Sequence, residues 1–127
     1  MIEITDKPIN PSEIYRRVSH KNSGSVVVHF GVVKESVGGK RSRGILFSPK
    51  GDLGGELKAL EASMRKNWAL EDVLIIRRMG ELHIGDIILA AAVSAEGRGD
   101  AFGACRDAVE GCKKIKNISK KELFEKD

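Results

Sequence analysis

Five lysines gather near the carboxyl end of the chain, and they are the side chains with the most scope for chemistry. Residues 111–121 contain Lys113, Lys114, Lys116, Lys120 and Lys121 and no acid. Crowded ammonium groups destabilise one another, which lowers the pKa of a lysine and frees it to act as a base or nucleophile. The simpler alternative is a solvated basic helix end, which the helix dipole favours.

The seven-residue spacing of Lys113 and Lys120 leaves two arrangements open. In a continuous helix, the two side chains would lie on one face, about two turns apart. If the chain instead turns at Asn117, Lys120 folds back towards Lys113.

Two further cations stand where anions are often bound. Lys34 follows an apolar run and opens a glycine-containing loop, and Arg98 lies in a loop just before an expected helix. Such positions often bind anions, although each residue alone is also compatible with an ordinary surface charge. The segment 34–50 carries five basic residues against Glu35, and the net charge of the chain is only +4. The charge is therefore local, which favours a local anionic partner over a generally basic surface.

Other kinds of chemistry find little support in the sequence. No segment has the pattern of a phosphate-binding loop, a Ser/His/Asp triad or a zinc site. Cys105 and Cys112 fall in one expected helix about 10.5 Å apart, which is too far for a disulfide, so two buried free thiols are expected. The chain has only six aromatic residues, which leaves a basic nucleic-acid-binding module as a minor alternative.

The length and composition suit one domain spanning residues 1–127. Hydrophobic residues make up 41% of the chain and charged residues 31%, so a packed core is expected. No apolar run approaches the roughly 20 residues of a membrane-spanning helix. The first residues also lack the pattern of a secretion signal, and a cytoplasmic protein is expected.

Hydrophobic periodicity predicts an α+β fold with a mixed or antiparallel sheet and about three helices. Asn10 and Pro11 form a helix start, and Asp100 is expected to cap the last helix. The valine-rich run 25–33 is expected to be a strand buried on both faces, whereas residues 34–43 and the polar tail from Lys116 carry no strand signal. The expected helices are 11–20, 54–68 and 101–114, and the expected strands are 2–5, 25–33, 44–47, 72–78 and 87–94.

Four segments resemble, in order and at near-family spacing, the large catalytic subunit of molybdopterin synthase. The first is the strand and loop at 24–34. The second runs from Trp68 through Arg77-Arg78-Met79-Gly80-Glu81-Leu82 to Gly85-Asp86. The third comprises 93–95, Arg98, Ala101-Phe102 and Ala104-Cys105, and the fourth runs from Lys113 through Lys120 to Glu125. Together these segments cover almost the whole chain.

This resemblance implies an α/β hammerhead-type fold and a homodimer of large subunits at the core of a heterotetramer. A ubiquitin-like small subunit would insert a C-terminal Gly-Gly tail that ends in a thiocarboxylate. The enzyme would be a sulfurtransferase that adds two sulfurs to cyclic pyranopterin monophosphate, forming the dithiolene of molybdopterin for molybdenum or tungsten cofactor biosynthesis. The resemblance implies no metal or cofactor for this step.

The family's catalytic residues map onto the basic carboxyl-terminal segment. Lys113 and Lys120 match the two active-site lysines of the family, and Lys121 and Glu122 continue the second motif. Lys113 would orient the small-subunit tail or activate the attack. Lys120 would hold the substrate, carry a proton or act as a covalent anchor.

The remaining substrate-binding residues implied by the resemblance come from two loops. Val32, Val33 and Lys34 match a substrate-contacting segment, with Lys34 where the family usually has arginine. Arg98, after Gly97, matches an arginine that the family supplies from the neighbouring protomer. Lys34 and Arg98 would hold phosphate.

The sequence also departs from the family pattern at several positions. The usual His before the loop arginine is Gly97 or Glu96, and the usual Pro and Trp before the second lysine are Asn117 and Ser119. Lysine at 34 lacks the bidentate grip of arginine on phosphate. These departures keep a second reading open, namely a divergent, non-catalytic relative that binds the small subunit or a pterin.

Overall fold

The computed structural model describes residues 1–125, which form three α-helices and eight β-strands. The helices are α1 (Ile14–Val18), which continues a 3-10 turn at Pro11–Glu13, α2 (Leu53–Asn67) and α3 (Arg98–Lys113). The strands are β1 (Ile2–Thr5), β2 (Ser25–Val32), β3 (Ser36–Val37), β4 (Lys40–Pro49), β5 (Asp72–Arg78), β6 (Gly80–His83), β7 (Ile87–Ala95) and β8 (Ile118–Phe124). No helix among these residues is long and apolar enough to cross a membrane.

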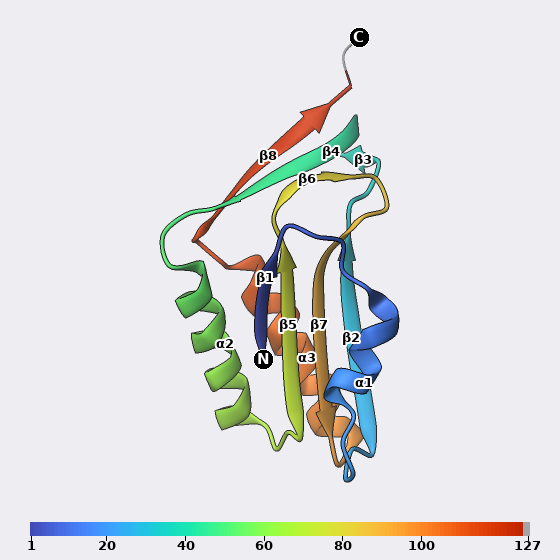
Figure 1. Ribbon diagram of the computed structural model, residues 1–127, viewed down its shortest axis with the longest axis vertical. Coiled ribbons are helices and arrows are strands. Elements are labelled where there is room, and N and C mark those ends of the chain that lie inside the picture. Colours follow the sequence, from blue (N-terminus) through green and yellow to red (C-terminus); the bar gives the residue numbers. More distant parts are fainter. Residues whose placement is uncertain (126–127) are drawn as a thin grey trace.

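The main sheet has the strand order β1-β5-β7-β2 and is mixed. β1 pairs with β5 in parallel, and β5–β7 and β7–β2 are antiparallel. Figure 1 shows α3 behind this sheet and α1 in front of it, so both faces are covered. The expectation of an α+β fold with a mixed sheet and about three helices is confirmed.

Alternate residues of the two central strands enter two separate cores. On the side of α2 and α3 lie Val73, Ile75, Ala91 and Val93. On the side of α1 lie the intervening residues, among them Leu74, Ile76, Ala90 and Ala92. Because successive side chains in a strand point to opposite faces, the continuous apolar runs of β5 and β7 are those of strands buried on both sides.

A second, smaller sheet is built around β4. This strand pairs in antiparallel fashion with β3, β6 and β8. In Figure 1, β4 and β8 cross above the end of the main sheet, and β6 leads directly out of β5. The chain therefore enters the second sheet immediately after Arg78, and the two sheets meet at this point.

Several sequence expectations about strands were wrong. β2 is an edge strand, and its side chains are half-buried or exposed, not buried on both faces. Residues 34–43 contain β3 and the beginning of β4, and the polar tail contains β8. β3, β6 and β8 carry too few apolar residues for a periodic signal and exist because β4 supplies their hydrogen-bond partners.

The helix starts were predicted with mixed success. The side chain of Asn10 accepts a hydrogen bond from the N–H of Ser12, and Pro11 follows it, which confirms that start. Asp100 does not cap α3. The helix begins earlier, with Gly97 at the N-cap, and Asp100 lies in its first turn, where a negative charge is favourable.

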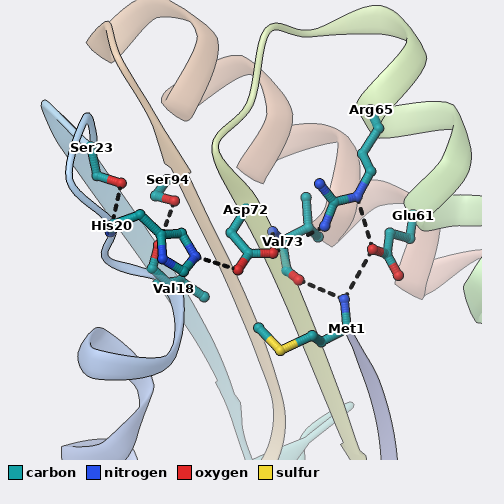
Figure 2. Close-up of polar contacts among 9 residues, drawn as sticks. All are labelled: Met1, Val18, His20, Ser23, Glu61, Arg65, Asp72, Val73 and Ser94. Carbon is teal, nitrogen blue, oxygen red and sulfur yellow. Dashed lines mark hydrogen bonds and ion pairs between the residues drawn. The ribbon is translucent and has the colours of Figure 1, made fainter.

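A polar cluster fixes the end of the main sheet away from the second sheet (Figure 2). The Asp72 carboxylate contacts His20 Nε2 at 2.6 Å and accepts from Arg65 Nη2 at 3.0 Å. Burial of Asp72 opposes ionisation, but its hydrogen bonds outweigh that effect and lower its pKa. Arg65 also donates to Glu61, which binds the terminal amine of Met1. The cluster thus ties β1, α2 and β5 together.

Two glycines let α2 and α3 pack closely. A Cβ built on Gly103 would lie 2.2 Å from Trp68 Cη2, and one built on Gly111 would lie 2.4 Å from Leu60 Cδ1. The indole of Trp68 also donates to Asp107 at 2.8 Å, which fixes the ring against α3. The position of α3, and of its last residue Lys113, depends on this contact.

We expect Gly103→Ala to lower the free energy of unfolding by about 1–2 kcal/mol. The added methyl clashes with the Trp68 ring, which outweighs the roughly 1 kcal/mol gain in helix propensity. Gly99→Ala is the matched control, because nothing lies within 4 Å of its Cβ position. Chemical denaturation of both variants checks the prediction, and equal stabilities would contradict it.

Candidate active site

A cavity of about 400 Å³ lies where the two sheets meet the end of α3. The main sheet contributes residues of β2, β5 and β7, the second sheet contributes β4 and β8, and α3 closes one side. Within residues 1–125, no carboxylate side chain lines the cavity. The charged or titratable lining residues are His29, Arg77, Cys112, Lys113 and Lys120, and the larger apolar ones include Phe47, Leu89 and Ile115.

The structure brings Lys113 and Lys120 together in this cavity. Lys113 is the last residue of α3, and Lys120 lies in β8. The helix does not continue through Asn117, so the arrangement in which the chain turns and Lys120 folds back is the one observed. The Lys113 side chain is 70% exposed, with Glu110 Oε1 at 3.8 Å from its Nζ, so this lysine stands at the open side.

A single carboxylate fixes the turn between the two lysines. Glu56, in the first turn of α2, accepts hydrogen bonds from the backbone N–H groups of Lys116 and Asn117 at 2.9 and 3.0 Å. It also accepts one from the side-chain amide of Asn117 at 2.9 Å. The hydrogen bond from Lys116 is the main cause that lowers the pKa of Glu56.

Asn117 connects this turn to the segment before α2. Its carbonyl oxygen accepts a hydrogen bond from the N–H of Lys50 at 3.0 Å. Its side chain lies so close to Gly51 that a Cβ there would be 2.1 Å from Oδ1, and Gly51 has a φ of 58°. Asn117 stands where the related family usually has proline, and here it makes specific contacts of its own.

Arg77 lines the cavity and was not selected from the sequence. It is only 9% exposed, and its Nη1 donates to the carbonyl of Ile88 at 3.3 Å. Its guanidinium carbon lies 4.5 Å from the centre of the Phe47 ring, and burial lowers its pKa. The available signal was the alternation in β5, where Arg77 follows Val73 and Ile75 on the inward-facing side.

The two cysteines are free, as expected, but only Cys105 is fully buried, and Cys112 is half-buried. Cys112 lines the cavity, and burial raises its pKa to about 11, with Arg77 opposing the shift. At neutral pH it is therefore a thiol and a poor nucleophile. His29 also lines the cavity. No group of three or more His, Cys, Asp and Glu residues suited to a metal ion occurs within residues 1–125.

The other residues selected from the sequence lie outside the cavity lining. Val33 is buried and Lys34 exposed, just beyond Gly31 at the cavity wall. Gly97 and Arg98 stand at the opposite end of α3, about 22 Å from Lys113 along a helix of this length. One small anion cannot contact both Arg98 and Lys113 of the same chain.

The last two selected residues, Lys121 and Glu122, follow Lys120 along β8. Lys121 is exposed and, by strand alternation, points away from the face that carries Lys120. Glu122 returns to the face of Lys120, and both of its carboxylate oxygens are buried without a hydrogen-bond partner in residues 1–125. The register pairs Lys120 with Phe47 and Glu122 with Ile45, two buried residues of β4.

The fold and the cavity define a class of α+β protein. Its cavity lies at the junction of two sheets and is lined by cations, with no carboxylate among the described lining residues. A family model described as MoaE protein matches residues 4–115. The chain belongs to this family, which confirms the resemblance found in the sequence.

Known proteins extend this match over nearly the whole chain. The molybdopterin synthase catalytic subunit of Bacillus subtilis strain 168 is 32% identical over 124 residues, covering 97% of this chain and 79% of the relative. The solved molybdopterin synthase from Staphylococcus aureus has a TM-score of 0.90 and 30% identity, covering 97% of this chain and 90% of that one. A chain in the Helicobacter pylori complex of molybdopterin-converting factor subunits 1 and 2 shares the fold, with a TM-score of 0.78, 16% identity and coverage of 98% and 90%.

We expect Glu56 to make stability fall at acidic pH. Its pKa in the folded state lies below the ordinary 4.5, so its contribution is complete above that value and is lost as the pH falls through the folded-state pKa. Urea unfolding from pH 7 to about pH 3 should therefore show a shallower decline for Glu56→Gln than for the original chain. Glu71→Gln, at an exposed site, should leave the decline unchanged, and parallel curves for all three proteins would contradict the prediction.

Proposed function

We propose that this chain is the catalytic subunit of a molybdopterin synthase. It transfers sulfur from the C-terminal thiocarboxylate of a ubiquitin-like small subunit to cyclic pyranopterin monophosphate. The observation that carries the proposal is the convergence of Lys113 and Lys120 on a cavity with no lining carboxylate. Both ligands of this reaction are anions, and fixed positive charge in a partly closed site stabilises anions more strongly than it would in water.

The size and lining of the cavity suit the same substrate. Its volume of about 400 Å³ lies in the range of small-molecule sites. Phe47, Leu89 and Ile115 supply apolar contacts for a fused ring system, and the cations supply contacts for its phosphate. An apolar and cationic site with an open side also admits the end of an extended peptide.

The two lysines take different roles because they come from different elements. Lys113, exposed at the end of α3, orients the incoming tail and assists the attack of its sulfur. Lys120, on β8 beside Phe47, holds the substrate and carries a proton, or serves as a covalent anchor. Lys121 and Glu122 continue this strand as further substrate-binding residues, and Val32, Val33 and Lys34 border the substrate from the end of β2.

Arg98 completes the site of the other protomer in a homodimer. Its place at the far end of α3 excludes direct action with Lys113 of its own chain on one small anion. In our proposal two large subunits form the core of a heterotetramer, each a single domain of residues 1–127, and the enzyme works in the cytoplasm. Neither nucleic acid nor a membrane takes part.

We expect Lys113→Ala and Lys120→Ala each to lower the rate of product formation by at least about tenfold, the lower range for loss of a positioned acid–base or anion-binding group. The assay combines the chain with a thiocarboxylated Gly-Gly partner and the pterin precursor. Lys114→Ala removes a neighbouring lysine outside the cavity lining and should leave the rate nearly unchanged. Unchanged rates in both test variants would refute the assignment, and capture of the partner without turnover in the original chain would favour a non-catalytic relative.

We expect two inactive variants to restore activity when they are mixed. Heterodimers of Arg98→Ala with Lys113→Ala contain one site with both defects and one site with neither. Random exchange of protomers should therefore recover roughly a quarter of the original activity, as two-fold symmetry dictates. Unfolding the variants together and refolding them tests this, and a mixture no more active than its parts would place Arg98 outside the shared site.

A further inference from the structure

Arg77 is a buried cation without an acidic partner. It is 9% exposed, and it is absent from the ion pairs found in residues 1–125. Burying an unpaired charge is costly, and an anionic partner offsets that cost for a buried cation. Arginine keeps its proton under almost all conditions, so this charge is a permanent feature of the cavity wall.

The hydrogen bonds of Arg77 leave part of its guanidinium without a partner. Nη1 donates to the carbonyl of Ile88 at 3.3 Å, and the Phe47 ring lies against the group at 4.5 Å. Nε is buried and has no hydrogen-bond partner among the described residues. The terminal Nη2 makes no hydrogen bond within residues 1–125 and is not among the fully buried atoms. Terminal guanidinium N–H groups are donors that the oxygens of a phosphate or carboxylate accept.

The surroundings of Arg77 favour an anion held deep in the cavity. Lys113 and Lys120 line the same cavity, no carboxylate does so, and Lys113 is largely exposed whereas Arg77 is buried. An anion that belongs to a small ligand can reach the buried position. The end of a partner's tail, arriving from solvent, meets Lys113 first.

We propose that Arg77 is an anion-binding residue whose guanidinium holds the phosphate of the pterin substrate at the wall of the cavity. The identity of this ligand rests on the proposed function, whereas the binding of a phosphate group does not. Arg77 thus anchors the substrate. Lys120 lies next to Phe47, whose ring contacts Arg77, and Lys113 remains available to bind the sulfur donor.

The test is Arg77→Met, which removes the charge and keeps an unbranched apolar stem. Affinity for inorganic phosphate, measured by calorimetry at constant ionic strength, should fall by at least about tenfold, as for the loss of a charge-assisted hydrogen bond. KM for the cyclic phosphate substrate should rise by a similar factor with a smaller change in kcat, and binding of the thiocarboxylated small subunit should be unchanged. Lys114→Met is the control, since it removes equal charge outside the cavity lining.

Unchanged phosphate affinity and unchanged KM in the folded variant would overturn the proposal. Weaker binding of the small subunit with unchanged phosphate affinity would also overturn it, because the guanidinium would then serve the tail. If Arg77→Met does not fold, Arg77→Lys decides, since it keeps the charge but loses the planar guanidinium and its terminal N–H donors. If phosphate binding depends on Arg77 but the original chain shows no turnover, the proposed function fails and this inference still holds.

Discussion

The arrangement of the cavity depends on one carboxylate, that of Glu56. Lys113 ends a helix and Lys120 lies in a strand of a different sheet, so their proximity is set by the few residues between them. Glu56 binds two backbone N–H groups and one side-chain amide of that link from the start of α2. Because Trp68, which follows α2, packs against Gly103 of α3, the same region of the chain positions both α3 and the link.

Phe47 plays a comparable part between the two sheets. In the second sheet it pairs with Lys120 of β8, and its ring lies over Arg77 of the main sheet. An aromatic ring tolerates a cation against its face better than an aliphatic side chain does. One residue therefore supports two cations of the cavity without introducing a carboxylate that would neutralise them.

The elements that the sequence predicted well are those whose own pattern of apolar residues marks a buried face. β5, β7 and α2 have strong apolar patterns and formed close to the expected positions. β8 and β6 have polar sequences and are strands only because β4 lies alongside them. β2 looks like a central strand from its valines, yet it stands at the edge of the sheet, where one side of its backbone has no partner among residues 1–125.

By itself, the sequence determined the fold class, the free thiols and the two lysines around which the candidate site is built. Residue type and spacing sufficed, because a helix start, an apolar stripe and a local excess of charge are properties of neighbouring residues. Only the tertiary structure decided that Lys120 folds back, that Arg98 lies at the far end of α3, and that Arg77 faces the cavity. These depend on contacts between residues distant in sequence, such as Glu56 with Asn117 and Phe47 with Arg77, which no local pattern encodes.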